Sequence, residues 1–315
     1  MAHPLSPRLP AGPVPAPATA ESGPGAEIEL TGFSGARILL IRSEGQEAFV
    51  RKISAAPAGN VRLQAQAIKQ RLISGLLDGC ARTPRVLDEG ILETGLYFFD
   101  MEFVRGRDGI AFLRSADLPD VVCVVDRLLE SLTRLSGMED LTSGFSPRTV
   151  ARMKCREILD KTGPADQRAQ QALHGLLDAI ERVDMPDRLA PSACHGDMTL
   201  ENILITDRNE LIFIDLLDSF FDHWLADAAK LEQDLKAGWY TRHSPPLPAG
   251  VTHYVQDRLN GFAGSRFGAA AGPLKELLLG IHLARIIPYA HEAQQRDFVL
   301  ARLEDLLART SGDRL

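Results

Sequence analysis

The sequence predicts an α+β fold with two lobes, a small antiparallel β lobe followed by a larger helical lobe. Residues 27–104 contain short apolar segments separated by Gly-containing turns, a pattern typical of strands. Beyond residue 105, apolar residues recur at helical spacing in longer segments. Strands gathered in one part of the chain and helices in the other indicate an α+β arrangement. We therefore expect an N-terminal lobe over 27–104 and a C-terminal lobe over 105–315, with helices over 60–77, 121–135, 149–161, 168–183, 251–262, 273–290 and 294–310.

Residues 1–26 differ in composition from the rest of the chain. They contain seven prolines, with Ala, Gly and Ser between them. The absence of an apolar central region excludes a secretory signal, and such a composition buries too little apolar surface to fold. We expect a disordered Pro-rich leader here.

Composition excludes several classes of protein. The net charge of −7 and pI of about 5.7 argue against nucleic-acid binding. No apolar run approaches the ~20 residues that span a membrane. The four cysteines form no C-x-x-C pair, which is typical of reduced thiols rather than a zinc site or disulfide framework. We expect a cytoplasmic monomer or homodimer whose partners are small molecules, not nucleic acid or membrane.

The densest set of polar residues lies between 193 and 218. Residues 203–205 and 211–214 are strand-like, and the turn residues 206–210 between them predict a hairpin. A turn centred near Arg208 places Asn202 across from Asp215, with Cβ atoms roughly 4.5–5.5 Å apart. An amide oxygen and a carboxylate at that distance can share Mg2+. Asp197, in the loop that enters the hairpin, can accept a proton from a substrate hydroxyl.

The sequence H-G-D-M-T-L-E-N of this loop, followed by I-D, resembles the catalytic loop H-R-D-x-x-x-x-N and the metal-binding Asp of protein-kinase-like enzymes. The Gly after His is similar to the aminoglycoside phosphotransferase and choline kinase branch. The resemblance implies a two-lobed protein-kinase-like fold, Asp197 as catalytic base, and Asn202 and Asp215 as Mg2+ ligands. The alternative is a polar loop before an ordinary surface hairpin.

Two segments of the N-terminal part resemble the nucleotide-binding elements of the same superfamily. The turn T-G-F-S-G-A at 31–36 offers Gly32, Ser34 and Gly35 to phosphate, although a plain hairpin turn explains the glycines equally well. The strand F-V-R-K-I ends near Lys52, which the resemblance assigns to phosphate. The alternative role for Lys52 is that of a charged residue on an edge strand, where it would aid solubility. Alternation places Val50 on its face and Arg51 on the opposite one.

The strand over 98–104 resembles the hinge that hydrogen-bonds adenine through its backbone, which assigns Glu102 and Val104 to the nucleotide. A buried central strand is compatible with the same residues. The preceding helix over 60–77 lacks the acid that often pairs with the lysine. Gln64, Gln66 and Gln70 are the only candidates in this helix to orient Lys52, and the alternative is that packing and the nucleotide hold it.

Residues after the hairpin are assigned more loosely. The segment A-D-A-A-K-L resembles the D-L-A signature of the branch, which implies that Asp227 accepts backbone N–H bonds near the catalytic loop. We interpret His195 as a residue that orders this loop. The C-terminal helices build the acceptor pocket in the superfamily, so Asp222, Trp239, Tyr240 and Arg285 are candidates by position, with core or surface roles as the alternative.

These observations predict a Mg2+-dependent phosphotransferase. It would move the γ-phosphate of ATP, with GTP as an alternative donor, to a hydroxyl of a small molecule. A sugar, an aminoglycoside and an amino alcohol are the acceptor classes that we consider. A catalytically silent kinase-like protein that binds nucleotide or regulates a partner is the alternative.

Overall fold

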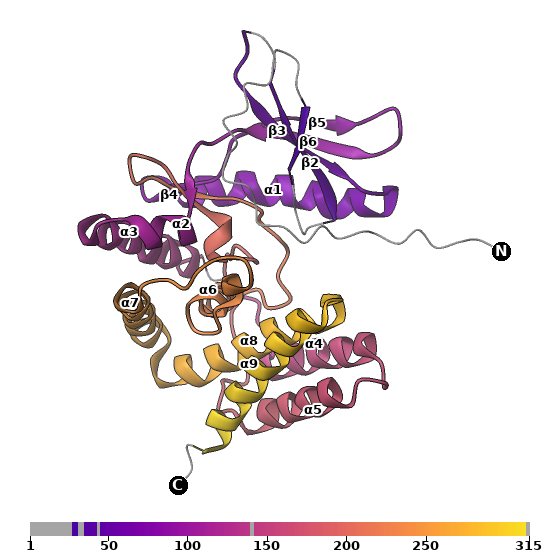
Figure 1. Ribbon diagram of the computed structural model, residues 1–315, viewed down its shortest axis with the longest axis vertical. Coiled ribbons are helices and arrows are strands. Elements are labelled where there is room, and N and C mark those ends of the chain that lie inside the picture. Colours follow the sequence, from indigo (N-terminus) through magenta and orange to yellow (C-terminus); the bar gives the residue numbers. More distant parts are fainter. Residues whose placement is uncertain (1–26, 31–34, 43–44, 139–141, 313–315) are drawn as a thin grey trace, which may run out of the picture.

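The structure is a computed structural model that describes residues 27–30, 35–42, 45–138 and 142–312. The expected leader lies outside these residues. A β-sheet and one long helix form the upper part of the molecule in Figure 1, above a larger helical part. The predicted two-lobed α+β fold is thereby confirmed.

The N-terminal lobe is built on a five-stranded antiparallel sheet in the order β1-β2-β3-β6-β5. Its strands are β1 (Glu27–Leu30), β2 (Ala36–Ile41), β3 (Phe49–Ser54), β5 (Val86–Ile91) and β6 (Tyr97–Glu102). Strand β3 lies between β2 and β6. Val50 and Lys52 are both buried on one face of β3, while Arg51 ion-pairs with Asp100 opposite it on β6. The predicted alternation is confirmed.

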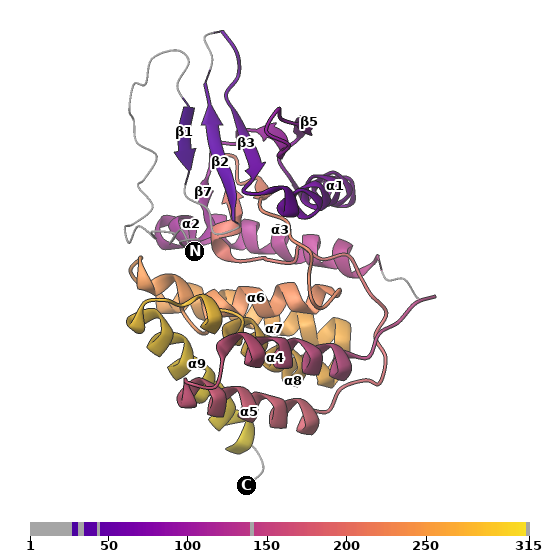
Figure 2. The ribbon, with the colours of Figure 1, turned by 90° about the vertical axis from the view of Figure 1, so that its right-hand side faces the viewer.

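Helix α1 (Asn60–Leu76) covers the sheet, as Figure 2 shows from the side. Leu63 and Ala67 of α1 pack in one cluster with Val50, Phe99 and Met101 of the sheet. The burial of these side chains fixes the helix beside β3 and β6 and leaves the rest of its surface toward solvent and the second lobe.

A smaller sheet lies where the two lobes meet. Strand β4 (Ala81–Arg82) pairs in parallel with β9 (Leu211–Phe213), followed by β8 (Ile203–Ile205) and β7 (Arg107–Asp108). The segment 103–106 connects β6 to β7. A Cβ atom on Gly106 would lie only 2.9 Å from the carbonyl oxygen of Ile205, so a glycine lets this connection pass directly against the hairpin.

The C-terminal lobe is helical. It contains α2 (Gly109–Ser115), α3 (Leu118–Ser136), α4 (Pro147–Thr162), α5 (Gln167–Arg182), α6 (Trp224–Leu235), α7 (Ala249–Phe267), α8 (Ala271–Ala284) and α9 (Ala293–Gly312), with short 3-10 turns at Leu200–Asn202, Trp239–Arg242, Gly268–Ala270 and Ile287–Tyr289. Helix α8 ends six residues earlier than the expected 273–290 element, where Pro288 and a 3-10 turn interrupt the helical pattern. No helix within the described ranges is long and apolar enough to cross a membrane.

Helix α6 is the centre of this lobe. Eleven of its twelve residues are buried, and it packs against α8, α7 and α3. A buried helix carries polar side chains only where they have partners. Glu232 of α6 pairs with Lys275 of α8, while Asp227, Lys230 and Asp234 face the loop that contains His195.

Candidate active site

Asp227, in the first turn of α6, holds the backbone of the His-Gly-Asp loop. Its carboxylate accepts hydrogen bonds from the backbone N–H groups of His195 at 2.6 Å and Gly196 at 2.8 Å. Burial raises the pKa of Asp227 to about 6, although the two backbone donors favour its charged form. These contacts agree with the role that the family resemblance implied.

Gly196 allows the loop to close on the segment that follows β9. Its φ angle is +91°, and a Cβ atom there would lie 2.0 Å from the carbonyl oxygen of Leu217. The N–H of Leu217 donates to the carbonyl of His195 at 3.0 Å. An L-residue with a side chain fits neither this conformation nor this space.

Two further side chains of α6 hold the loop from the same helix face. Lys230 and Asp234 follow Asp227 at i+3 and i+7, a spacing that aligns side chains along one face. Lys230 Nζ lies 3.0 Å from Asp197 Oδ1, and Asp234 Oδ2 accepts from the N–H of Leu200 at 2.8 Å. Asp234 Oδ1 is buried without a partner among the described residues, and burial raises the pKa of Asp234 to about 7.

His195 has no exposed surface and packs edge-on against Phe213. Its Nδ1 accepts a hydrogen bond from the N–H of Asp197 at 3.2 Å. Burial lowers the pKa of His195 to about 4, so the ring is neutral at pH 7. This neutral ring orders the loop and stays out of reach of solvent.

The hairpin register differs from the prediction by one residue. Strands β8 and β9 pair Ile203 with Phe213, and the N–H of Ile214 donates to the carbonyl of Asn202 at 3.0 Å. The predicted pairing of Asn202 with Asp215 was therefore wrong. The N–H of Thr206 donates to the carbonyl of Glu210, so the turn spans the predicted residues 206–210. A turn with an odd number of residues places Asn202 opposite Ile214, and the predicted pair would need an even number.

Asp215 enters the site by a different route. It follows the last paired residue and adopts a φ angle of +59°, which ends the strand and turns the side chain off its alternating pattern. Asp215 Oδ1 lies 2.8 Å from Lys52 Nζ of β3. Lys52 is 3% exposed, so an ion pair at the junction of the lobes compensates its buried charge.

Asn202 faces Ile214, the residue before Asp215, and its side chain contacts the His-Gly-Asp loop. Its Nδ2 donates to the backbone carbonyl of Asp197 at 2.8 Å and to Asp197 Oδ2 at 3.2 Å. The structure thus brings Lys52, Asp197, Asn202 and Asp215 together from β3, the loop and the hairpin. Burial acts to raise the pKa of Asp197, but the ion pair with Lys230 outweighs it and holds the pKa below its usual range.

The expected glutamine partner of Lys52 is not found. Gln70 Nε2 donates to the carbonyl of Pro84 at 2.6 Å, Gln66 Oε1 is buried without a partner, and Gln64 is exposed. Among the described residues none of the three hydrogen-bonds Lys52. Lys52 instead pairs with the carboxylate of Asp215.

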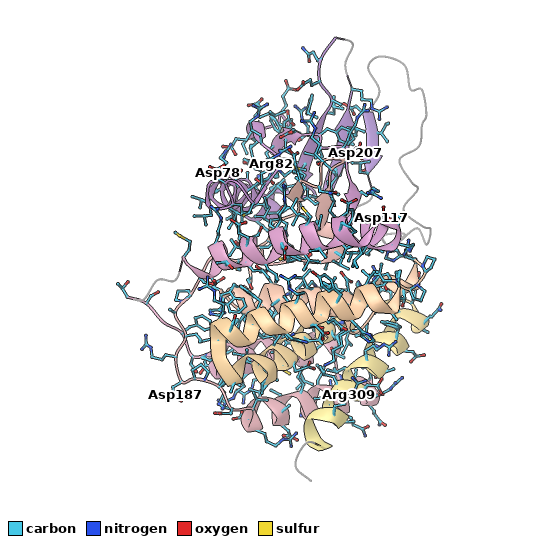
Figure 3. All side chains as sticks on the ribbon, turned by 90° about the vertical axis from the view of Figure 1, so that its left-hand side faces the viewer. Asp78, Arg82, Asp117, Asp187, Asp207 and Arg309 are labelled. Carbon is cyan, nitrogen blue, oxygen red and sulfur yellow. The ribbon has the colours of Figure 1, made fainter. Side chains whose placement is uncertain are left out.

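The expected nucleotide-binding segments are placed as follows. Gly32 and Ser34 lie outside the described residues, and Gly35 has a φ angle of +73°. The carboxylate of Glu102 is bound by both terminal nitrogens of Arg82, labelled in Figure 3, so this side chain joins β6 to β4. Val104 lies between β6 and β7, and no hydrogen bond to its backbone occurs within the described part of the chain. Their contact with adenine stays a prediction.

The positional candidates for the acceptor pocket separate into two kinds. Tyr240 is 4% exposed, and its hydroxyl accepts from the N–H of Leu247, while Trp239 stacks with Arg242 and Phe298. These two residues pack the lobe. Arg285, by contrast, interacts electrostatically with Asp197.

Sequence reasoning missed three residues of this site. Lys230 and Asp234 could have been found from their helical spacing after Asp227. Lys69 of α1 gave no such signal. Its Nζ donates to the carbonyl of Leu217 at 2.5 Å and thereby ties the N-terminal helix to the segment after Asp215.

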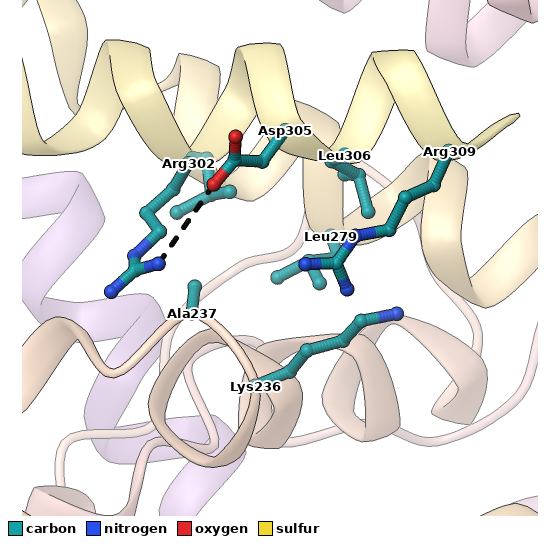
Figure 4. Close-up of a pocket in the computed structure, with 8 residues that line it drawn as sticks. Lys236, Ala237, Leu279, Arg302, Asp305, Leu306 and Arg309 are labelled. Atoms are coloured by element: carbon teal, nitrogen blue, oxygen red, sulfur yellow. Dashed lines mark ion pairs between the residues drawn. The ribbon is translucent and has the colours of Figure 1, made fainter. Parts of the chain in front are cut away.

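A small cavity elsewhere in the lobe is distinct from this site. It lies between α6, α8 and α9 near Lys236, Leu279 and Arg309 (Figure 4). Lys236 follows the C-terminal end of α6, whereas Asp227 and Lys230 hold the catalytic loop nearer its N-terminal end. This cavity has no part in the arrangement described above.

The chain combines a β lobe with a helical lobe and places the ion pair of Lys52 and Asp215 beside the His-Gly-Asp loop. This arrangement defines a protein of the kinase-like class. The family model described as "Phosphotransferase enzyme family" (APH) matches residues 29–268. The chain belongs to this family.

Solved structures share the fold at low sequence identity. A thermostable mutant of aminoglycoside phosphotransferase APH(4)-Ia in apo form has a TM-score of 0.60 and 15% identity, covering 91% of this chain and 95% of that one. The GDP and kanamycin complex of APH(2")-IIia has a TM-score of 0.63 and 14% identity, with 94% and 96% covered. A putative fructosamine-3-kinase from Thermobifida fusca YX-ER1 has a TM-score of 0.60 and 16% identity, with 90% and 93% covered. No curated protein matches the sequence.

Proposed function

We propose that this protein is a Mg2+-dependent phosphotransferase that moves the γ-phosphate of ATP to a hydroxyl of a small molecule. The observation that carries the proposal is the convergence of Lys52, Asp215, Asn202 and Asp197 at the junction of the lobes. Family membership supports it. Structural neighbours bind ADP with hygromycin B, or GDP with kanamycin, which supports a nucleotide donor and leaves GTP as an alternative to ATP.

The donor atoms fit a magnesium ion. Two oxygen atoms accept no hydrogen bond from the described residues. One is Asp215 Oδ2, since Lys52 contacts Oδ1, and the other is the amide oxygen of Asn202, whose hydrogen bonds are made through Nδ2. One carboxylate and one neutral oxygen match the few protein ligands that Mg2+ takes beside water and phosphate. When bound, Mg2+ would neutralise charge on the nucleotide phosphates.

The remaining assignments rest on the family resemblance and on the place of Lys52. Lys52 would exchange its contact with Asp215 for phosphate oxygens, helped by Gly32, Ser34 and Gly35, and the backbone at Glu102 and Val104 would receive adenine. Such positioning supplies most of the catalysis, because phosphoryl transfer needs little covalent help from protein.

Asp197 would hold the acceptor hydroxyl. Its lowered pKa keeps the carboxylate charged and able to accept a hydrogen bond. In the transfer, the acceptor oxygen bonds to the γ-phosphorus, the bond between that phosphorus and the β,γ-bridging oxygen breaks, and ADP leaves. The hydroxyl proton passes to Asp197.

The test combines turnover with nucleotide binding. ADP release is measured with Mg2+–ATP and a panel of sugars, aminoglycosides and amino alcohols, and the phosphorylated product is identified by mass spectrometry. Asp197→Asn should lower kcat by about 10²–10⁴-fold, the usual contribution of a general base. Nucleotide Kd should change less than about tenfold, because Asp197 does not hold the nucleotide.

The matched control is Asp207→Asn, an exposed residue on the hairpin turn that Figure 3 labels; it should behave like wild type. Full activity of Asp197→Asn would exclude it as the base. Tight nucleotide binding by the wild type without transfer to any acceptor would favour a silent nucleotide-binding protein. A cytoplasmic location and a monomeric or homodimeric state are part of the same proposal.

A further inference from the structure

The two carboxylate oxygens of Asp197 face different neighbours. Oδ2 accepts from Asn202 Nδ2 at 3.2 Å, on the proposed metal side. Oδ1 pairs with Lys230 Nζ at 3.0 Å, and the Lys230 side chain is 12% exposed. Lys230 therefore marks the side of Asp197 that is turned away from Asn202, where an acceptor has to approach.

Arg285 adds a second positive charge to this side. It directly follows α8, and its guanidinium lies over the ring of Phe220, 5.3 Å from the centroid. An NH1 atom lies 3.5 Å from His282 Nδ1. His282 Nε2 is 3.2 Å from the carbonyl of Ala226, and a carbonyl only accepts, so Nδ1 carries the lone pair that faces Arg285.

The contacts of Arg285 leave its charge uncompensated. Burial lowers the pKa of His282 well below its usual value, so the imidazole is neutral, and an aromatic ring carries no net charge. No carboxylate of the described residues lies within 4.0 Å of the guanidinium. Asp197 is within electrostatic range but already pairs with Lys230. Arg285 is partly withdrawn from solvent, and a cation in such a place without a partner is costly. An anion brought by a ligand would offset that cost.

The surroundings of Arg285 are positive as well. Glu157 of α4 also interacts electrostatically with Arg285, but it is shared by Lys154 at 2.8 Å and Lys161 at 2.6 Å. Arg62 of α1 acts on Arg285 from the other lobe. Glu157 is thus already neutralised and Arg62 adds positive charge, so neither compensates the charge of Arg285.

We propose that the acceptor is a hydroxylated small molecule that carries a carboxylate or a phosphate, bound by Arg285 and Lys230 while its hydroxyl reaches Asp197. This inference rests on the proposed phosphotransferase function. The planar fork of an arginine suits both anions. The amines of an aminoglycoside or an amino alcohol would be repelled by the same two cations, so the structure favours an acidic acceptor over these classes.

Charge-matched probes on a common scaffold test the proposal. Glucose, glucosamine, glucuronate and glucose 6-phosphate form one set, and glycerol, 3-amino-1,2-propanediol, glycerate and glycerol 3-phosphate form another. Each probe is titrated calorimetrically into the protein with Mg2+ and AMP-PNP at 0.15 M salt, and turnover with ATP is measured in parallel. In at least one set an anionic probe should bind about tenfold or more tightly than its neutral counterpart, and the cationic probe should bind most weakly. The carboxylate and phosphate members distinguish the two anions.

Variants connect the preference to the named residue. Arg285→Gln should abolish the anionic preference and leave the AMP-PNP Kd within about threefold. Arg285→Lys should retain part of the preference, because it keeps the charge and loses the fork. The matched control is Arg258→Gln on α7, whose partner is the exposed Asp126; it should keep the full preference.

The outcomes separate this inference from the function on which it rests. Four outcomes would overturn the inference if AMP-PNP binding is intact. They are equal binding of neutral and anionic probes, stronger binding of the amines, a preference for anions that survives in Arg285→Gln, and no binding of any probe. Failure of the wild type to bind AMP-PNP with Mg2+ would instead overturn the proposed function.

Discussion

Replacing Gly196 by Ala is the most direct test of how the catalytic loop is built. The new Cβ would lie 2.0 Å from the carbonyl oxygen of Leu217, a backbone atom that cannot swing aside. The φ angle of +91° adds a cost of about 1–2 kcal/mol for an L-residue. The loop has to move away from Leu217 or from Asp227, and either movement breaks buried hydrogen bonds.

The bonds at risk set the magnitude. They are the 2.8 Å bond from Gly196 N–H to Asp227 and the 3.0 Å bond from Leu217 N–H to the carbonyl of His195. Leaving a buried donor unpaired costs about 1–3 kcal/mol, so strain with one or both bonds lost amounts to about 2–8 kcal/mol. Asp197 is the next residue, and a displacement of about 1 Å can lower turnover about 10²-fold.

Urea unfolding followed by circular dichroism gives the change in stability, and ADP release gives the change in turnover. Gly261→Ala is the matched control, because it lies within α7 and its Cβ would meet no atom within 4 Å. It should stabilise the protein by about 0.5–1 kcal/mol through helix propensity. Wild-type stability and turnover in Gly196→Ala would refute the packing argument for this loop.

Two further variants test the contacts that surround the loop. Asp234→Asn should flatten the fall in Tm between about pH 4 and 7. Burial raises the pKa of Asp234 to about 7, so the folded wild type binds a proton that the unfolded chain has released and loses up to about 1.4 kcal/mol per pH unit across this range. Asp187→Asn, exposed at the edge of the helical lobe in Figure 3, is the control, and parallel curves for Asp234→Asn and wild type would contradict the assignment. Lys69→Met should lower stability by about 1–3 kcal/mol in urea, because the buried carbonyl of Leu217 loses its donor. Arg71→Met, two residues further along the same helix in an exposed pair with Glu89, should cost less than about 1 kcal/mol. Equal losses would show that Lys69 forms no tie between the lobes.

Local sequence pattern predicted the elements that carry the site. Strand alternation placed Lys52 on the buried face of β3, and the short spacing within H-G-D-M-T-L-E-N placed Asp197 beside Asn202. These features depend on neighbouring residues, so periodicity and spacing are sufficient to identify them.

The failures all involved information that a local pattern does not contain. The turn spans the predicted residues 206–210, and one residue more or less within it would change which residue faces Asn202. The left-handed conformation of Asp215, which brings it to Lys52 instead of leaving it on the hairpin, is set by the surrounding structure. Lys69 meets Leu217 across 148 positions of the chain, and no spacing rule reaches that far.

The three residues of α6 that contact the loop lie on one face of the helix, and this affects how the chain tolerates insertions. Asp227, Lys230 and Asp234 reach His195, Asp197 and Leu200 respectively. Each residue added inside a helix rotates everything after it by about 100°. One residue inserted between Asp227 and Lys230 would therefore keep the contact of Asp227 with His195. It would rotate Lys230 and Asp234 away from the loop and toward a different face of the helix. The phase of a helix that begins 27 residues after Asp197 thus determines the shape of the loop, and insertions and substitutions in α6 are subject to different constraints.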